Sequence, residues 1–315
     1  MKAVCKRIGI ILAWVLGGLL ALVFLIWGGL NLFKFILYSD YYAVKQDVCL
    51  NPGLSDGFVC QGIGVSETYD RILVSGYMNN GEPSRIYVTD RNSNSYYVSL
   101  SEGGRPFDGH VGGLAVEGDT VYLASDGHLW TVDAKAVLAA NNGDTVDITG
   151  SIPVNNHASF VFSTEEYLFV GEFHDGGKYV TEHPYDTPDG RQHAIISRYL
   201  IEDLSKPDCV YSVRDRVQGA CFTERGRVIL STSYGLSDTK YYVYDETAAV
   251  DSGLTLDGAP VYYLVDPIRE IKGPAMGEDV DVSDGRVYTL FESASDKYIF
   301  GKFFFADRIV SLRFE

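Results

Sequence analysis

The sequence predicts an all-β body of repeated four-stranded units that follows one apolar N-terminal helix. Three observations support this prediction. The chain has 315 residues, 46% of them hydrophobic, which is enough for one large domain or two ordinary ones with a sizeable core. A hairpin pattern recurs five times after residue 41, where Val, Ile, Thr and Tyr are frequent. Residues 8–33, in contrast, contain no charged side chain.

The uncharged stretch 8–33 has the length of a membrane-spanning helix, for which roughly 20 apolar residues are enough. Lys2, Lys6 and Arg7 precede it, so the positive-inside tendency places residues 1–7 in the cytoplasm. A cleaved signal peptide is the alternative, but its apolar region would have about 7–15 residues and would end in a small-residue cleavage site. We therefore expect a signal anchor at 8–33, a juxtamembrane linker at 34–40 and an extracellular domain at 41–315, on a single-pass protein of the cell membrane.

Five segments share a strand, a short polar turn and a second apolar strand. They are residues 61–77, 112–126, 158–173, 218–234 and 278–293. A third strand follows each hairpin, as in "GHLWTVD" and "KYYVYD". Sheets of four strands that repeat about every 50 residues are typical of β-propeller blades, which pack face to face because no blade buries its own core. The sequence therefore predicts a five-bladed β-propeller with antiparallel four-stranded blades.

A fourth strand follows in four of the five units. We expect these strands within residues 95–102, 144–154, 209–215 and 260–266. The fifth unit ends with the chain, whereas residues 41–58 precede the first unit and have no blade of their own. The simplest closure has this N-terminal stretch supply the outermost strand of the last blade, because closure removes free sheet edges. A sixth blade would need a sixth hairpin, which the sequence does not contain.

The segments "HVGGLAV", "QGACFTERGRVILSTSYG" and "LFESASDKY" resemble repeats of uncharacterised membrane-anchored or secreted five-bladed propeller proteins of Gram-positive bacteria. The resemblance to the β-propeller superfamily covers residues 41–315. It implies the fold and an extracytoplasmic location, and it carries no catalytic residue over.

The domain after residue 40 is strongly acidic. It has 41 acidic and 22 basic residues, a net charge of −19, within a whole-chain charge of −16. Such a domain is a poor candidate for binding nucleic acid. Cationic ligands or a divalent cation fit the charge better, although solubility alone would also explain it. No cofactor is predicted beyond such a cation.

Four cysteines lie in the extracellular part of the chain. Cys49 and Cys60 are 11 residues apart, and Cys209 and Cys221 are 12 apart. In an oxidising compartment each pair could form a local disulfide. Buried free thiols would produce the same pattern.

The order of strands in a blade assigns every loop to one of two faces. The loops that enter the first strands and those between the second and third strands share one face, which we call the mouth. We expect it to gather Gln61, Tyr77, His110, Asp126, His157, Glu172, Gln218, Ser233, Tyr234, Glu278 and Glu292. The opposite face has short polar turns such as "EGD" and "SDG", which are ordinary turn chemistry.

Two long inserts belong to the mouth. Residues 174–193 contain His174, His183 and His193, and residues 293–306 contain Tyr298 and the run Phe303–Phe305. Long inserts on one face of a repeat fold are typical of a binding face. The alternative is that the polar residues only satisfy backbone groups and channel water at the narrow end of each blade.

Two functional hypotheses follow. The first is a binding module for a small polar ligand, a cell-envelope component or a protein partner, with Gln61, Tyr77, Asp126, Gln218, Ser233, Tyr234 and His174 as contact candidates. The second is a hydrolase or lyase that uses paired carboxylates and histidine, with or without a metal ion. Its candidates are Glu172, Glu278, Glu292, His110 and His157. No nucleophile elbow and no HExxH motif is present in the sequence.

Overall fold

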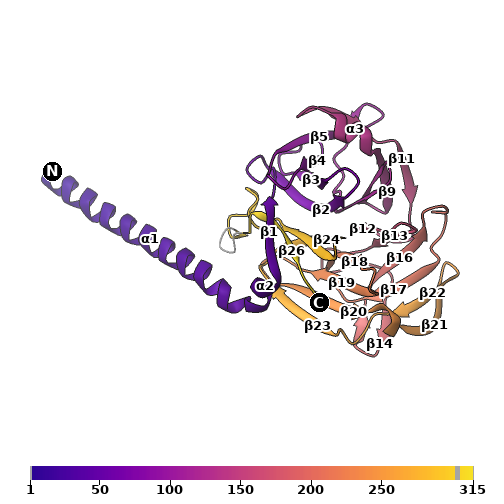
Figure 1. Ribbon diagram of the computed structural model, residues 1–315. Coiled ribbons are helices and arrows are strands. Elements are labelled where there is room, and N and C mark those ends of the chain that lie inside the picture. The colour runs from indigo at the N-terminus through magenta and orange to yellow at the C-terminus, as the bar shows by residue number, and fades with distance from the viewer. Residues whose placement is uncertain (1, 302–305, 315) are drawn as a thin grey trace.

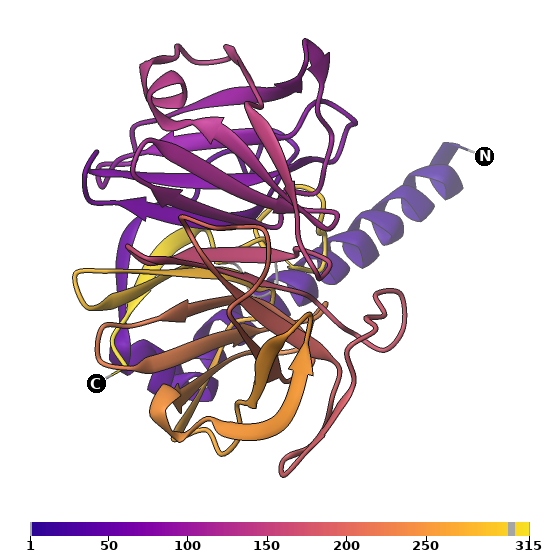
Figure 2. The same cartoon turned by 90° about the vertical axis from the view of Figure 1, so that its right-hand side faces the viewer.

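The computed structural model describes residues 2–301 and 306–314 and consists of a long N-terminal helix joined to a five-bladed β-propeller (Figure 1). The run Phe303–Phe305, predicted to help form the mouth, lies outside the described residues. Helix α1 (Lys2–Leu37) projects away from the propeller and has the length and composition to cross a membrane between Lys6 and Leu37. Figure 2 shows the propeller from the side opposite to α1.

Each blade has four antiparallel strands at its centre, which follow one another from the axis outward. The first has β2 (Phe58–Ser66), β3 (Arg71–Met78), β4 (Arg85–Thr89) and β5 (Ser95–Glu102); the second has β7 (Gly113–Glu117), β8 (Thr120–Ser125), β9 (His128–Asp133) and β11 (Gly150–Pro153); the third has β12 (Phe160–Ser163), β13 (Tyr167–Gly171), β16 (Ala194–Leu200) and β17 (Cys209–Val213). The fourth has β18 (Val217–Phe222), β19 (Arg227–Thr232), β20 (Thr239–Asp245) and β23 (Arg269–Gly273), and the fifth has β24 (Gly277–Ser283), β25 (Arg286–Phe291), β26 (Arg308–Leu312) and β1 (Lys45–Leu50).

The last blade is closed by the N-terminal strand, as predicted. Strand β1 pairs antiparallel with β26, from Lys45 opposite Leu312 to Leu50 opposite Arg308. The two ends of the propeller therefore share one sheet, and backbone hydrogen bonds lock the ring.

Two predicted fourth strands were wrong in part. Residues 260–266 are not the fourth strand of the fourth blade: β22 (Ala259–Tyr263) and its hairpin partner β21 (Val250–Leu256) extend the third blade, where β22 runs parallel to β17. The true fourth strand is β23, in a segment for which the sequence predicted no strand. Residues 144–154 are divided in the same way, since β10 (Thr145–Asp147) pairs parallel with β5 of the first blade and only β11 completes the second. In both cases a connecting segment covers the outer edge of the preceding blade, which would otherwise expose unpaired backbone groups.

The remaining elements lie in connections between strands. They are α3 (Ala134–Ala139), the 3-10 turn η1 (Glu246–Ala248), β6 (Arg105–Pro106), and the hairpin of β14 (Tyr185–Thr187) with β15 (Gly190–Gln192) inside the third-blade insert.

Glycines allow the innermost strands to approach one another at the axis. A Cβ atom on Gly62 of β2 would lie 2.6 Å from the backbone of Leu114 in β7. A Cβ on Gly113 would lie 2.4 Å from the backbone nitrogen of Val161 in β12. Because real Cβ atoms do not approach backbone this closely, these positions require glycine for a close contact between blades.

Two carboxylates of β24 join the fifth blade to the first. Asp281 accepts hydrogen bonds from the backbone nitrogens of Val65 (2.5 Å) and Val282 (2.8 Å). Asp279, which is fully buried, accepts from Ile63 at 3.3 Å and from Leu114 at 3.4 Å. These donors lie on inner strands, so the carboxylates satisfy backbone groups that no neighbouring strand pairs. Burial raises the pKa of both side chains, that of Asp281 to about 7.

All four cysteines of the propeller are free and buried, so neither predicted disulfide forms in this structure. Cys60 lies on the innermost strand β2, where its Sγ contacts Nδ2 of Asn51 at 3.0 Å, whereas Cys49 lies on the outermost strand β1. Cys209 and Cys221 are likewise on an outermost and an innermost strand, of different blades. Strand placement separates the members of each pair, and burial raises the pKa of all four thiols.

The predicted linker at 34–40 is largely helical. Helix α1 continues to Leu37, and α2 (Ser39–Val44) begins two residues later. Tyr38, between the two helices, is buried, and its hydroxyl donates to Asp238 at 2.8 Å. Tyr41 is also buried and packs against Gly273 and Phe291. The apolar helix is therefore joined directly to the fourth and fifth blades.

The close contacts at the axis predict that Gly113→Ala destabilises the propeller. The added methyl group would overlap backbone atoms of β12, and overpacking of this kind costs about 1–3 kcal/mol. We expect the thermal unfolding midpoint of the full chain in detergent to fall by several degrees. Gly177→Ala is the control, because a Cβ there meets no atom closer than 3.6 Å. Equal midpoints for the two variants would contradict the proposed contact.

Candidate functional site

The mouth brings two of the predicted glutamates together. Glu278 lies on β24 and Glu292 directly follows β25, so the antiparallel hairpin returns both to the same end of the blade. Their side chains are hydrogen-bonded to each other. Glu292 Oε2 also accepts from Gln61 Nε2 at 3.0 Å and from the Tyr298 hydroxyl at 2.9 Å. We call Glu278 and Glu292 the carboxyl pair.

Both members of the carboxyl pair hold protons more tightly than ordinary glutamates. Burial, and then the charge of Glu292, raise the pKa of Glu278 well above its usual value. Burial also raises the pKa of Glu292 to about 7, although Tyr298, Lys297 and Gln61 act in the opposite direction. Two carboxyl groups in hydrogen-bond contact cannot both ionise easily, so the pair retains a proton near neutral pH.

Beside the carboxyl pair, Lys297 connects the fifth-blade insert to the first blade. Its ammonium group donates to the Tyr77 hydroxyl and lies 4.7 Å from the centroid of the Tyr77 ring and 5.0 Å from that of Tyr298. The ring of Tyr77 in turn lies 4.7 Å from the ring of His110. Part of His110 reaches solvent, but surrounding protein atoms and the charge of Lys297 lower its pKa. Neutral His110 and two tyrosines thus form an aromatic border beside the carboxyl pair.

The third glutamate has different partners. Glu172 is fully buried, and its Oε1 lies 2.8 Å from Nδ1 of His183 in the third-blade insert. Its other oxygen accepts from the backbone nitrogen of His157 at 3.4 Å. The hydrogen bond to Glu172 raises the pKa of His183. The side chain of His157 is exposed, so this residue meets Glu172 through its backbone.

Residues that could hold a metal ion are His174, His193 and Asp215, whose potential ligand atoms all lie within 4.8 Å of one another. The two imidazole rings stack at 4.5 Å between centroids. Hydrogen bonds also account for this arrangement: His193 Nδ1 lies 3.0 Å from an oxygen of Asp215, and His174 Nδ1 lies 2.9 Å from the Thr181 hydroxyl. The group offers nitrogen and carboxylate ligands of the kinds that Zn²⁺ accepts.

The other predicted contact residues are spread over the same face. Asp126 follows β8 and accepts from the Ser125 hydroxyl at 2.7 Å. Gln218 lies on β18 at an irregularity of the β18–β19 pairing and is half buried. Ser233 is buried, and the neighbouring Tyr234 packs its ring 5.9 Å from that of Phe173.

Sequence reasoning missed Lys297, Thr181 and Asp215 as members of the mouth. Lys297 was detectable in principle, since it lies inside an insert already assigned to this face. Thr181 also lies in an insert assigned to this face, but the sequence does not show which histidine the fold brings beside Thr181 or Asp215.

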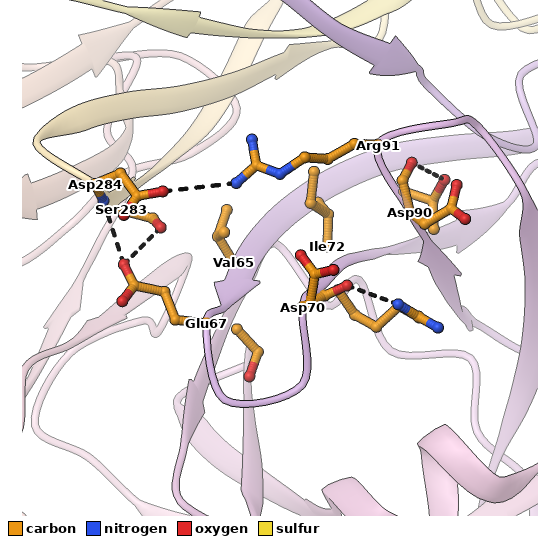
Figure 3. Close-up of a pocket in the computed structure, with 11 residues that line it drawn as sticks. Val65, Glu67, Asp70, Ile72, Asp90, Arg91, Ser283 and Asp284 are labelled. Carbon is orange, nitrogen blue, oxygen red and sulfur yellow. Dashed lines mark hydrogen bonds and ion pairs between the residues drawn. The ribbon is translucent and has the colours of Figure 1, made fainter.

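A surface cavity of about 160 Å³ lies on the face opposite to the mouth (Figure 3). It is formed by hairpin turns of the first and fifth blades, with Glu67 accepting from the Ser283 hydroxyl at 2.7 Å and Arg91 lying 3.8 Å from Asp284. These two contacts cross from the first blade to the fifth, which suits a role in holding these blades together.

Comparisons with known proteins give distant likenesses to solved structures and no closer relationship. No protein-family model matches the sequence, and no curated protein matches it. Among solved structures, the PQQ-bound aldose sugar dehydrogenase of Streptomyces coelicolor is 16% identical, with a TM-score of 0.43 over 79% of this chain and 77% of that one. BamB of Moraxella catarrhalis is 9% identical, with a TM-score of 0.34 over 81% and 84%. The WD40 domain of Toxoplasma gondii coronin is 7% identical, with a TM-score of 0.38 over 80% and 69%. These likenesses concern the fold alone.

The carboxyl pair predicts a defined pH dependence of stability. The pKa of Glu292 is about 7 in the folded protein, against an ordinary value of 4.5 for an exposed glutamate, so the folded protein keeps a proton that the unfolded chain releases. The stability it contributes is complete below about pH 4.5 and is lost as the pH rises through about 7. We expect Glu292→Gln to reduce this decline and to stabilise the protein at pH 8 by about 1–3 kcal/mol relative to wild type.

The measurement is chemical unfolding of the full chain between pH 4.5 and 8. Asp281 titrates in the same window, so a smaller slope should remain in Glu292→Gln. Glu102→Gln, at an exposed position on β5, is the control and should follow wild type. An unchanged slope in Glu292→Gln would show that the pair does not share a proton in the folded protein.

Proposed function

We propose that this protein is a membrane-tethered, extracytoplasmic β-propeller that binds a polar, polyhydroxylated ligand at its mouth. The carboxyl pair is the observation on which the proposal depends. Two carboxyl groups buried in contact cost stability unless another interaction compensates. Proteins commonly keep destabilising groups with shifted pKa values at their functional sites.

The surroundings of the carboxyl pair favour a neutral, hydroxyl-rich ligand over a cation. The charge of Lys297 acts on both glutamates and on His110, and that of Lys178 also acts on His110. A pair that retains a proton and lies beside Lys297, with Lys178 acting on the neighbouring His110, has little net attraction for a cation, despite the acidic domain. Protonated and ionised carboxyls together donate and accept hydrogen bonds, and the rings of Tyr77 and Tyr298 offer apolar faces of the kind that pack on sugars.

An enzymatic role is the second candidate, because paired carboxyl groups with raised pKa values are a known arrangement for acid and base catalysis. The separation of the groups argues against glycoside hydrolysis. That chemistry needs carboxyls about 5–9.5 Å apart so that the sugar or a water fits between them. Glu278 and Glu292 are in direct hydrogen-bond contact, so a binding role fits the geometry better.

The location follows from α1. A helix of this length and composition, with Lys6 and Arg7 at its N-terminal end, fits a signal anchor whose N-terminus is cytoplasmic. The propeller would then lie outside the cell, where polyhydroxylated envelope components are available as ligands or partners.

The proposed site predicts that ligand binding depends on the carboxyl pair and on Tyr77. The full chain in detergent is screened by thermal shift against neutral mono- and oligosaccharides, including amino sugars with acetylated nitrogen. A ligand that stabilises wild type should bind at least about tenfold more weakly to Glu292→Gln and Tyr77→Ala, a loss of one or two good hydrogen bonds or a stacking contact.

The matched control is Glu67→Gln, which removes a carboxylate from the cavity on the opposite face. It should bind as wild type does. Equal weakening in all three variants, or binding that none of them changes, would contradict a site at the mouth.

A further inference from the structure

Three loops of the mouth carry exposed apolar side chains at their tips. Val180 in the third-blade insert is 60% exposed, Leu236 in the fourth blade 49%, and Ile299 in the fifth-blade insert 77%. All three loops join a second to a third strand, so they belong to one face. Exposing large aliphatic side chains to water at the tips of neighbouring loops is unfavourable for a domain surrounded by solvent.

Two of these tips share a local sequence. Lys178, Tyr179 and Val180 in the third blade correspond in type to Lys297, Tyr298 and Ile299 in the fifth. Segments that lie at a membrane interface typically combine basic, aromatic and aliphatic residues, as these two segments do. The domain has a net charge of −19. Lys178 and Lys297 therefore place positive charge on these loops although the domain as a whole is negative.

The apolar helix reaches the propeller beside these loops. Tyr38, the first residue after α1, donates to Asp238, two residues beyond Leu236 in the fourth-blade loop. In Figure 1, α1 projects from the side of the propeller on which β1 of the fifth blade lies. Because only Tyr38 separates α1 from α2, no flexible linker holds the propeller away from the helix end.

We propose that the mouth-side loops of the third, fourth and fifth blades dock onto the outer surface of the bilayer that α1 spans. Val180, Leu236 and Ile299 enter the interface, with Lys178 and Lys297 at head-group level. This inference rests on the proposed membrane anchoring and deepens the proposed function, because it turns the mouth toward the membrane. A ligand of the carboxyl pair would then reach it along the bilayer surface, as the polar head group of a membrane-bound molecule would.

The test uses the full chain in lipid nanodiscs that contain anionic lipid and a lipid with a nitroxide quencher near its head group. Single cysteines at Val180, Leu236 and Ile299, in a Cys5→Ser background, carry an environment-sensitive fluorophore. The four propeller cysteines are buried and are not expected to react. Ile268, an exposed residue just before β23 on the opposite face, gives the matched control site.

We expect emission from the three loop sites to fall by about twofold or more with the nitroxide lipid and that from Ile268→Cys to stay unchanged, as expected for side chains seated about 5–10 Å into the interface. A label at Phe24, near the middle of α1, reports on anchoring separately in matched nanodiscs whose lipid carries the nitroxide deep in its acyl chain. Quenching at Phe24 without quenching at the loop sites would overturn the docking and leave the anchoring intact. Absence of quenching at Phe24 would overturn both, whereas the sugar-binding test in detergent would be unaffected.

Discussion

The structure depends on how closely five inner strands can approach one axis. Glycines at Gly62 and Gly113 remove the Cβ atoms that would hold adjacent strands apart. The carboxylate of Asp279 then occupies the space that remains and accepts from backbone nitrogens of the first and second blades. A buried carboxylate is costly alone, but at the axis it satisfies edge donors that would otherwise be buried without partners. In the sequence, Asp279 has the character of an ordinary surface charge. In the fold, it links the blades that close the ring.

The geometry of the mouth follows from this closure. The hairpin of β24 and β25 carries Asp279 in its interior and the carboxyl pair at its end, so the position of the pair is fixed by the strands that close the ring. Gln61 reaches Glu292 from the first blade only because β2 packs against β24. The fifth-blade insert adds Lys297 and Tyr298 from above. The candidate site is therefore built from the first and fifth blades. Its geometry depends on how closely their inner strands pack at the axis.

The sequence predicted much of this because propeller repeats are local. Hairpin periodicity identified five blades, and the unpaired strand at each end of the repeat array predicted the pairing of β1 with β26. It also placed Glu278 beside Glu292, since the two ends of one hairpin must meet. The partner of β22 was mispredicted because an alternating apolar strand has the same pattern whether it completes one blade or covers the edge of another. The insert that contains Lys297 was assigned to the mouth, but the sequence does not show that this lysine meets Tyr77.

The central claim is that Asp279 joins the blades at the axis, and amide hydrogen exchange tests it most directly. In Asp279→Ala the oxygen that accepts from the backbone nitrogens of Ile63 and Leu114 is lost, so the account predicts faster exchange in β2 and β7 together, with β16 on the outer part of the third blade unchanged. Asp189→Ala, in a surface turn of the third-blade insert, is the control. Unchanged protection of β2 and β7 in Asp279→Ala would contradict the account.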